Sequence, residues 1–226
     1  MATPATAQPQ LIARDLFQSF RMGPRRIEVL RGISMDIFRG EAVFLCGASG
    51  AGKTTLLYTL AGLERPESGT VEFAGQRLYT GRSSSQAKLR NRKMGFVFQG
   101  YFLLPELTAL ENVMLPGMIG NTSNQSAGEA GLAAVGLQER MHHLPAEMSG
   151  GEQQRVAIAR SLTNDPVIVF ADEPTGNLDS KTGETIIDLL LKLARERNKT
   201  LLVVTHDERL AQRGDRTLRI VDGVLQ

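Results

Sequence analysis

Short apolar runs alternate with longer stretches of helical spacing along most of the chain. Four of these runs are continuous, as in strands that are buried on both faces of a sheet: residues 42–46, 94–98, 167–171 and 201–204. Because helical stretches separate these runs, the pattern predicts an α/β fold with a mostly parallel sheet and helices on both of its faces.

Two regions depart from this alternation. Residues 11–38 and 70–79 are predicted to form antiparallel strands, since apolar and polar positions alternate at Ile33, Met35 and Ile37. Residues from about 100 to 160 are helical in pattern, and we interpret them as a helical subdomain inserted into the α/β core. The sequence thus predicts one domain, residues 11–226, with an antiparallel β subdomain and a helical subdomain.

Length and composition exclude several classes of protein. The 226 residues are 42% hydrophobic, enough to bury a core, and the single Cys excludes a disulfide-stapled domain. A net charge of +2 argues against a protein that mainly coats nucleic acid. No apolar run approaches the roughly 20 residues that span a bilayer, and residues 1–10 lack the features of a secretory signal. We expect a chain that does not itself cross a membrane and that begins with a flexible tail, residues 1–10.

A glycine-rich segment directly follows the run at residues 42–46 and precedes a helical stretch. Small residues allow backbone N–H groups to surround a phosphate, and the positive end of the next helix strengthens the attraction. Lys53 would neutralise the β- and γ-phosphates of a nucleotide, and the Thr54 hydroxyl would ligate Mg²⁺. The alternative is a glycine-rich turn with a solvated lysine. The segment matches Gly-x-x-x-x-Gly-Lys-Ser/Thr and comprises Gly47, Ala48, Ser49, Gly50, Ala51, Gly52, Lys53, Thr54 and Thr55.

Two adjacent carboxylates, Asp172 and Glu173, follow the run at residues 167–171. Ligands bind at the carboxyl ends of strands in open α/β sheets, so this is a suitable place for chemistry. Asp172 would bind Mg²⁺ directly or through water. Since side chains alternate along a strand, Glu173 could instead accept a proton from an attacking water. The alternative is that the pair merely ends a strand.

His206 and Gln99 follow two other apolar runs, so we expect them at neighbouring strand ends. The imidazole could hydrogen-bond the γ-phosphate and report its presence. The Gln99 amide could contact Mg²⁺ or water. The alternative for His206 is an ordinary satisfied polar residue, and an isolated glutamine carries little information.

A second helix start has an unusual composition. Ser149 and Glu152 have the spacing of a capping box, so a well-made helix start is one interpretation. Gly150 and Gly151 immediately after the cap weaken a helix, by about 1 kcal/mol each relative to Ala. Their presence suggests a close approach to the backbone, for which an anion is a natural candidate. With two phosphate-type sites in one chain, a nucleotide held between two chains becomes plausible.

In this order the motifs resemble the nucleotide-binding domain of ATP-binding-cassette (ABC) transporters. The resemblance extends from Leu11 to the C-terminus and rests on residues 47–55, Gln99, 149–152, 172–173, 177–179 and His206. It implies a P-loop NTPase (RecA-like) fold, ATP and Mg²⁺ as cofactors, and coupling of ATP hydrolysis to transport. Two departures are Met148, where Leu is commonest in the family, and Glu152, where Gln is commonest.

The resemblance also implies roles for individual residues. ATP would lie between two head-to-tail chains, with Phe20 stacked on the adenine. Glu173 would act as catalytic base and His206 as the switch, with Gln99 and Lys53 also catalytic. Thr54, Gln99 and Asp172 would hold the metal. The partner chain would contribute Ser149, Gly150, Gly151, Glu152 and Asp179.

Within this family, residues 98–113 and 171–179 look most like the lipoprotein-releasing, macrolide-efflux and cell-division group. This likeness implies a homodimer that drives integral membrane subunits from the cytoplasmic face of the inner membrane, most closely in lipoprotein release. Two alternatives are a nucleotide-gated scaffold of the cell-division type and a non-transport ATPase acting on nucleic acid. We expect no nucleic-acid partner, because such ATPases carry a long coiled coil or two cassettes, for which 226 residues leave no room.

Overall fold

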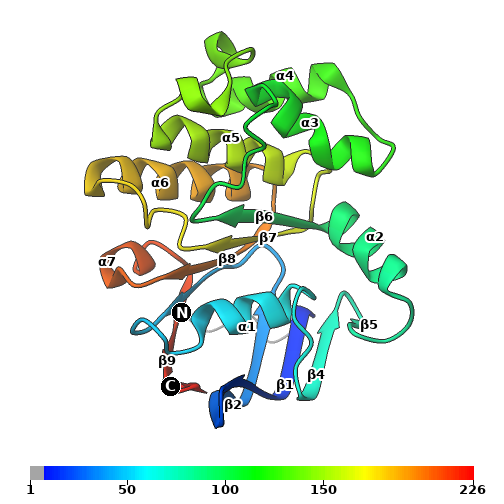
Figure 1. Cartoon of the computed structure of the whole chain (residues 1–226), viewed down its shortest axis with the longest axis vertical. Coiled ribbons are helices and arrows are strands. Elements are labelled where there is room, and N and C mark those ends of the chain that lie inside the picture. The colour runs from blue at the N-terminus through cyan, green and yellow to red at the C-terminus, as the bar shows by residue number, and fades with distance from the viewer. Residues whose placement is uncertain (1–7) are drawn as a thin grey trace.

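Two sheets with helices around them make up the computed structural model, which describes residues 8–226 (Figure 1). Over these residues the larger sheet has the order β10-β9-β3-β8-β7-β6 and the smaller sheet the order β2-β1-β4-β5. The larger sheet contains β3 (Ala42–Cys46), β6 (Met94–Phe98), β7 (Ile168–Asp172), β8 (Thr200–Thr205), β9 (Arg216–Val221) and β10 (Val224–Leu225). The smaller contains β1 (Pro9–Met22), β2 (Arg25–Phe38), β4 (Ser68–Phe73) and β5 (Gln76–Arg77).

The larger sheet is parallel except at β10. Strand β3 pairs in parallel with β8 and β9, and β7 pairs in parallel with β6 and β8. Every residue of β3, β7 and β8 is buried, which explains their continuous apolar runs. The predicted mostly parallel sheet is confirmed. Because the strands run in one direction, the ends that carry the predicted site residues meet at one edge of the sheet.

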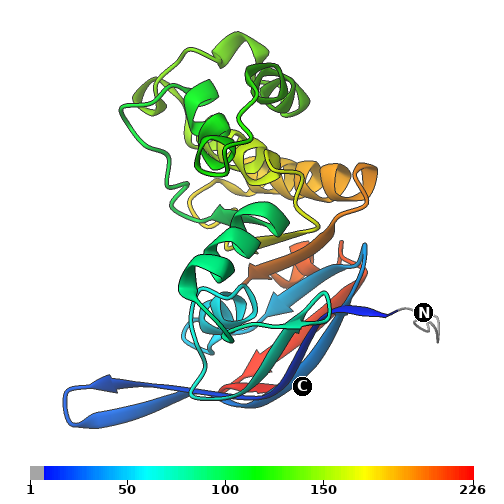
Figure 2. The same cartoon turned by 90° about the vertical axis from the view of Figure 1, so that its right-hand side faces the viewer.

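The smaller sheet is antiparallel throughout, as predicted for residues 11–38 and 70–79. Strands β1 and β2 form a long hairpin that extends away from the body of the molecule (Figure 2). The predicted tail boundary at residue 10 is wrong, because β1 begins at Pro9. Gln10 is buried, and its side chain donates a hydrogen bond to the carbonyl of Val167 at 3.2 Å. The first seven residues of the predicted tail lie outside the described residues.

Helices lie on both faces of the larger sheet, and α3 to α5 gather at one end of the molecule (Figure 1). We propose that these three helices, which fall within residues 100–160 except for the last two residues of α5, form the inserted subdomain. The helices are α1 (Lys53–Leu60), α2 (Ser83–Lys93), α3 (Ala109–Ile119), α4 (Gln125–Ala134), α5 (Gly150–Leu162), α6 (Ser180–Glu196) and α7 (Glu208–Ala211), with short 3-10 turns at Gln138–Arg140 and Pro145–Glu147.

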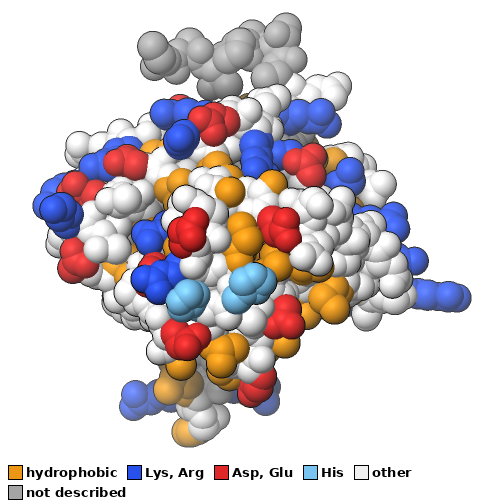
Figure 3. Space-filling view, turned by 90° about the horizontal axis from the view of Figure 1, so that it is seen from above, with side chains coloured by type: hydrophobic (Ala, Val, Ile, Leu, Met, Phe, Trp, Pro, Cys, Tyr) orange, Lys and Arg blue, Asp and Glu red, His pale blue; other side chains and the backbone are white. Residues whose placement is uncertain are grey.

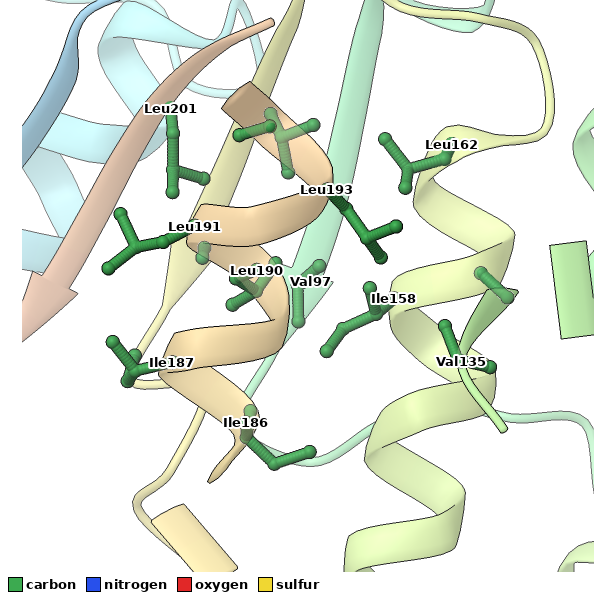
Figure 4. Packing of buried hydrophobic residues seen from close by; sticks show 14 of the residues in the cluster. Val97, Val135, Ile158, Leu162, Ile186, Ile187, Leu190, Leu191, Leu193 and Leu201 are labelled. Carbon is green, nitrogen blue, oxygen red and sulfur yellow. The ribbon is translucent and has the colours of Figure 1, made fainter. Parts of the chain in front are cut away.

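The core has two parts, one on each face of the larger sheet. On one face α6 presents Ile186, Ile187, Leu190 and Leu191 at helical spacing, and these pack toward Leu201 of the sheet and toward α5 (Figure 4). On the other face, the smaller sheet and α1 cover side chains such as Phe170. Both helices that begin at predicted motif residues, α1 and α5, are therefore fixed to the sheet by buried apolar contacts.

Candidate functional site

The glycine-rich segment forms a tight loop between β3 and α1. A Cβ added at Gly47 would lie 2.4 Å from the carbonyl oxygen of Ile220, and one at Gly52 would lie 2.7 Å from that of Val29. Gly52 also has φ +100°, a left-handed conformation that glycine adopts readily. No side chain caps α1 and its first turn contains no acid, so its N–H groups remain available to an anion.

The Lys53 side chain is folded back into this loop. Its Nζ donates hydrogen bonds to the carbonyl oxygens of Gly47 at 2.9 Å and Ala48 at 3.0 Å, and it lies 3.7 Å from Oε1 of Glu173. Only 7% of the residue is exposed. The loop thus places a buried positive charge beside the start of α1, where the dipole also favours an anion.

Asp172 ends β7 next to the first turn of α1. Its Oδ1 accepts a hydrogen bond from the Thr54 hydroxyl at 2.9 Å. Burial raises the pKa of this carboxyl, while hydrogen bonds from the hydroxyls of Thr54 and Tyr58 act in the opposite direction. Burial also raises the pKa of Tyr58 to about 12, and its protonated hydroxyl can donate to Asp172. The carboxylate and the Thr54 hydroxyl together form a small oxygen-rich surface.

Glu173, one residue further on, connects Lys53 to the end of β8. Its Oε2 lies 2.8 Å from Nδ1 of His206, and because an ionised carboxylate only accepts, Nδ1 carries the proton. Glu173 has φ 45°, a left-handed conformation that is strained for a residue with a side chain. Its N–H donates to the carbonyl of Val204 at 3.0 Å, which helps to fix this backbone. Strain of this kind often occurs where a side chain must point in a particular direction for function.

Gln99 leaves β6 and pairs with the loop that follows β7. Its Nε2 donates to Oδ1 of Asn177 at 3.1 Å, and Nδ2 of Asn177 donates to the Gln99 carbonyl at 3.0 Å. A Cβ at Gly176 would lie only 2.6 Å from Nε2 of Gln99. The amide is therefore held at the edge of the site, opposite the phosphate loop.

Five of the side chains just described, Lys53, Thr54, Gln99, Glu173 and His206, line one cleft of about 520 Å³, whereas Asp172 lies behind Thr54 and is not part of the lining. The cleft brings together residues from the predicted phosphate loop and from three strand ends. Val29 of β2 is a lining residue that the sequence analysis did not identify. The lining consists of Phe20, Val29, Ser49, Gly50, Gly52, Lys53, Thr54, Thr55, Gln99, Glu173 and His206.

The second helix start is a capping box with a charged partner. The Glu152 carboxylate accepts hydrogen bonds from the N–H and the hydroxyl of Ser149, both at 2.8 Å. These bonds lower the pKa of Glu152. Nε of Arg140 lies 3.4 Å from Oε1 of Glu152 and offsets its charge. Glu152 thus stabilises the start of α5 as an ionised carboxylate.

Packing inside the chain already accounts for both glycines of this turn. A Cβ at Gly150 would lie 2.8 Å from the Tyr101 hydroxyl oxygen and 3.3 Å from Leu178, and one at Gly151 would lie 2.8 Å from Cγ2 of Thr182. These two glycines therefore indicate an approaching anion less strongly than the sequence suggested. Among the described residues, none of those that the sequence assigned to a partner chain (Ser149, Gly150, Gly151, Glu152 and Asp179) lines the cleft.

The contact between Gly150 and Tyr101 predicts a stability effect. Gly150→Ala is expected to lower the free energy of unfolding by about 1 kcal/mol, because overpacking outweighs the better helix propensity of Ala. Tyr101→Phe in the same chain should restore stability, since the ring carbon Cζ lies 3.7 Å from the added Cβ position. Urea unfolding of the two variants and of Tyr101→Phe alone measures this, and an unchanged midpoint for Gly150→Ala would contradict the contact.

The side chains that hold the predicted residues in place were not predicted from the sequence. Asn177 was part of a quoted motif, but no signal predicted its pairing with Gln99, 78 residues away. Tyr58 could have been noticed as the residue one helical turn after Thr54, since residues four apart lie on one face of a helix. Nothing in the pattern indicated that Val29 lines the cleft.

Comparison with known families places the chain among ABC proteins. Residues 30–176 match the family described as "ABC transporter". A protein of Syntrophotalea carbinolica named "Lipoprotein-releasing system ATP-binding protein LolD" is 51% identical over 212 residues, which cover 92% of this chain and 93% of that protein. The "Uncharacterized ABC transporter ATP-binding protein YbbA" of Escherichia coli (strain K12) is 50% identical, with 93% and 94% covered.

The fold is similar to a solved structure titled "Dimeric structure of a post-hydrolysis state of the ATP-binding cassette MJ0796 bound to ADP and Pi". The TM-score is 0.88 at 38% sequence identity, and the match covers 96% of each chain. The predicted P-loop NTPase fold class is thereby confirmed.

Proposed function

The chain belongs to the ABC transporter family as an ATP-hydrolysing, ATP-binding subunit, and from this premise we propose that it powers a lipoprotein-releasing transporter. The observation that carries the catalytic part is the position of Glu173, held between Lys53 and His206 at the mouth of the cleft. The choice of lipoprotein release is supported by relatives of that name in three further organisms, which are 47–49% identical.

ATP fits the cleft with its phosphates at the N-terminus of α1. Lys53 and the free N–H groups of the loop would bind the β- and γ-phosphates. Phe20, which is exposed, also lines the cleft, and its ring would stack on adenine. The lining thus contains both charged groups for the phosphates and an aromatic ring for the base.

Mg²⁺ fits the oxygen atoms beside the phosphates. Adjacent ligands of an octahedral Mg²⁺ lie about 2.9 Å apart when each bond is about 2.0–2.1 Å. The Thr54 hydroxyl and Oδ1 of Asp172 are separated by 2.9 Å, so both could bind one ion directly, or Asp172 through water. The Gln99 amide oxygen would be a further ligand. When bound, the ion would neutralise charge that develops on the phosphates.

Hydrolysis would use the groups at the mouth of the cleft. A water attacks the γ-phosphorus, and Glu173 accepts its proton as the bond to the β-phosphate oxygen breaks. Lys53 stabilises the negative charge on the phosphates. When the His206 imidazole carries a proton on both ring nitrogens, Nδ1–H donates to Glu173 and Nε2–H can donate to an oxygen of the γ-phosphate. Loss of the γ-phosphate would therefore remove one contact of His206, whose other ring nitrogen is hydrogen-bonded to Glu173.

A second chain would complete each site. Ser149 and Asp179 cap helices and do not line this cleft, which supports their assignment to a nucleotide on another chain. MJ0796 was solved as a dimer with ADP and Pi. We infer that two copies of this chain enclose two ATP molecules, with residues 149–152 of one facing the phosphate loop of the other.

Separate membrane subunits would supply the transport path. No helix within residues 8–226 is long and apolar enough to cross a bilayer. The end of the molecule formed by α3 to α5 shows apolar side chains among charged ones (Figure 3). Exposed apolar residues of this region are Phe102, Leu104, Met118, Ile119 and Leu144. We place the docking of a membrane subunit here, on the cytoplasmic face of the inner membrane.

Capture and reconstitution test the proposed process. A tagged Glu173→Gln chain with ATP is expected to capture an integral subunit from detergent-solubilised membranes. When that subunit and the wild-type chain are reconstituted in liposomes, added lipoprotein should be released in an ATP-dependent manner. Glu184→Gln, which changes an exposed glutamate on α6, serves as the matched control for both steps. ATP-dependent efflux of a small molecule without lipoprotein release would assign the chain to a different process.

A further inference from the structure

The connection from Gln99 to α3 has a strained backbone at its first turn. Tyr101 has φ 59° and Phe102 has φ 47°, so two consecutive aromatic residues adopt the left-handed conformation. The N–H of Phe102 donates to the carbonyl of Gly100 at 2.6 Å, within the same tight turn. Such a turn persists only when other contacts hold it.

Arg160 in the last turn of α5 provides that contact. Its Nη2 donates to the carbonyl of Tyr101 at 2.6 Å and its Nη1 to the carbonyl of Phe102 at 2.5 Å. Burial lowers the pKa of Arg160, and no carboxylate among residues 8–226 forms an ion pair with it. The planar guanidinium thus directs two of its five N–H donors, one from each terminal nitrogen, at the carbonyls of the two strained residues.

The rest of the connection is anchored independently of Arg160. Asn112, fully buried in α3, accepts from the N–H of Leu104 at 2.8 Å and donates to the carbonyls of Leu104, Leu107 and Thr108. Only the first turn, directly after Gln99, therefore depends on the guanidinium. A change at Arg160 should leave residues 104–108 in place.

Tyr101 extends this contact to the other end of α5. Its carbonyl is bound at Arg160, in the last turn, while its hydroxyl oxygen lies beside Gly150, in the first turn. The residue thus joins the strand end that carries Gln99 to the helix start that carries Ser149. These are the two parts of one chain that face two different nucleotides under the proposed function.

We propose that Arg160 is a positioning residue: by holding Tyr101 and Phe102 in their strained turn, it makes the start of α5 respond to the ligand at Gln99 of the same chain. The inference rests on the proposed ATP dimer. Without the guanidinium, the turn relaxes and Tyr101 leaves Gly150. The cleft still binds ATP, but the chain presents residues 149–152 poorly to its partner.

The test measures ATP-driven dimer formation by sedimentation. It compares variants at Arg160 with their parent, a chain that carries Glu173→Gln. Arg160→Met is expected to raise the ATP concentration for half-maximal dimerisation by about tenfold, because it removes two charge-assisted hydrogen bonds. Binding of ADP to the monomer should stay within about twofold of the parent, since Arg160 is outside the cleft lining. Arg160→Lys retains the charge but not the planar pair of donors, so its ATP concentration for half-maximal dimerisation should lie between those of the parent and of Arg160→Met. This variant also tests the inference if Arg160→Met does not fold.

A rescue separates positioning from a general structural role. Phe102→Gly in the Arg160→Met chain is expected to recover most of the lost dimerisation, because glycine adopts the left-handed conformation without strain. Phe102→Ala removes the same ring but leaves the strain, so it should not rescue. Equal rescue by Phe102→Gly and Phe102→Ala would overturn the inference but not the proposed dimer. Unchanged dimerisation in Arg160→Met and Arg160→Lys would do the same. A parent that fails to dimerise with ATP would instead overturn the proposed dimer, and the inference with it.

Discussion

Glu173→Gln reduces the rate of ATP hydrolysis by about 100-fold or more, the size of effect expected when a general base is lost. The amide oxygen can still accept the hydrogen bond from Nδ1 of His206, now 2.8 Å from Oε2, so the geometry of the mouth of the cleft is retained. An amide cannot accept the proton of the attacking water. Steady-state phosphate release with Mg²⁺ and ATP, with the membrane subunit present, measures the effect.

Binding of ATP by the same variant distinguishes loss of chemistry from loss of the site. Its dissociation constant should remain near that of the wild type, because Lys53 keeps its bonds to the carbonyls of Gly47 and Ala48. Glu184→Gln is a suitable control for the loss of one carboxylate. A Glu173→Gln chain with wild-type turnover would exclude the assigned base. If turnover falls but the associated membrane process continues, the chain acts as a nucleotide-gated scaffold rather than a motor.

The central buried strands were predictable because the larger sheet is covered on both faces. Burial on both sides favours apolar residues throughout β3, at residues 168–171 of β7 and at residues 201–204 of β8, which gives runs that are visible in sequence. Strand β9 lacks such a run because it is only partly covered, and its Arg216 pairs with Glu41 at 2.7 Å. The helix α2 has no buried residue, so no apolar period marks it.

Site residues that directly follow a strand could be predicted from the sequence. Contacts that depend on the packing of distant segments could not. The end of a parallel strand is a position that sequence can identify, so Asp172, Glu173 and His206 were placed at one edge of the sheet before their contacts were known. The contacts of Gln99 with Asn177 and of Tyr101 with Gly150 and Arg160 join segments that are distant in sequence. A single sequence contains no spacing rule for such pairs.

At Gly150 the sequence predicts a close approach to the backbone, and the group that makes it belongs to the same chain. The sequence suggested that something approaches the backbone closely there, and the structure shows that the Tyr101 hydroxyl does so. The start of α5 therefore needs glycine for folding as well as for any role toward a partner. Separating the two requires a variant that relieves the internal contact, such as Tyr101→Phe, alongside the glycine substitution.

Lys53→Met weakens ATP binding by about 100-fold, because removing one member of a buried, hydrogen-bonded charge pair typically costs 2–5 kcal/mol. The Lys53 side chain is 7% exposed, and its ammonium donates to two carbonyls of the phosphate loop and lies 3.7 Å from Glu173. Methionine fills similar volume but leaves the phosphates and the Glu173 carboxylate without their common positive neighbour. Calorimetric titration with MgATP measures the affinity directly.

Two further variants define what the site requires of this lysine. Lys53→Arg should also bind weakly, because a planar guanidinium cannot reproduce the compact contacts of Nζ with two adjacent carbonyls. Lys192→Met, which removes an exposed lysine of α6 paired with Glu196, should bind ATP as the wild type does. Affinity that survived in Lys53→Met would mean that the helix dipole and loop N–H groups suffice to hold the nucleotide. Loss of affinity in Lys53→Met, together with loss of turnover alone in Glu173→Gln, would instead separate binding from catalysis at two residues whose side chains lie within ion-pair distance.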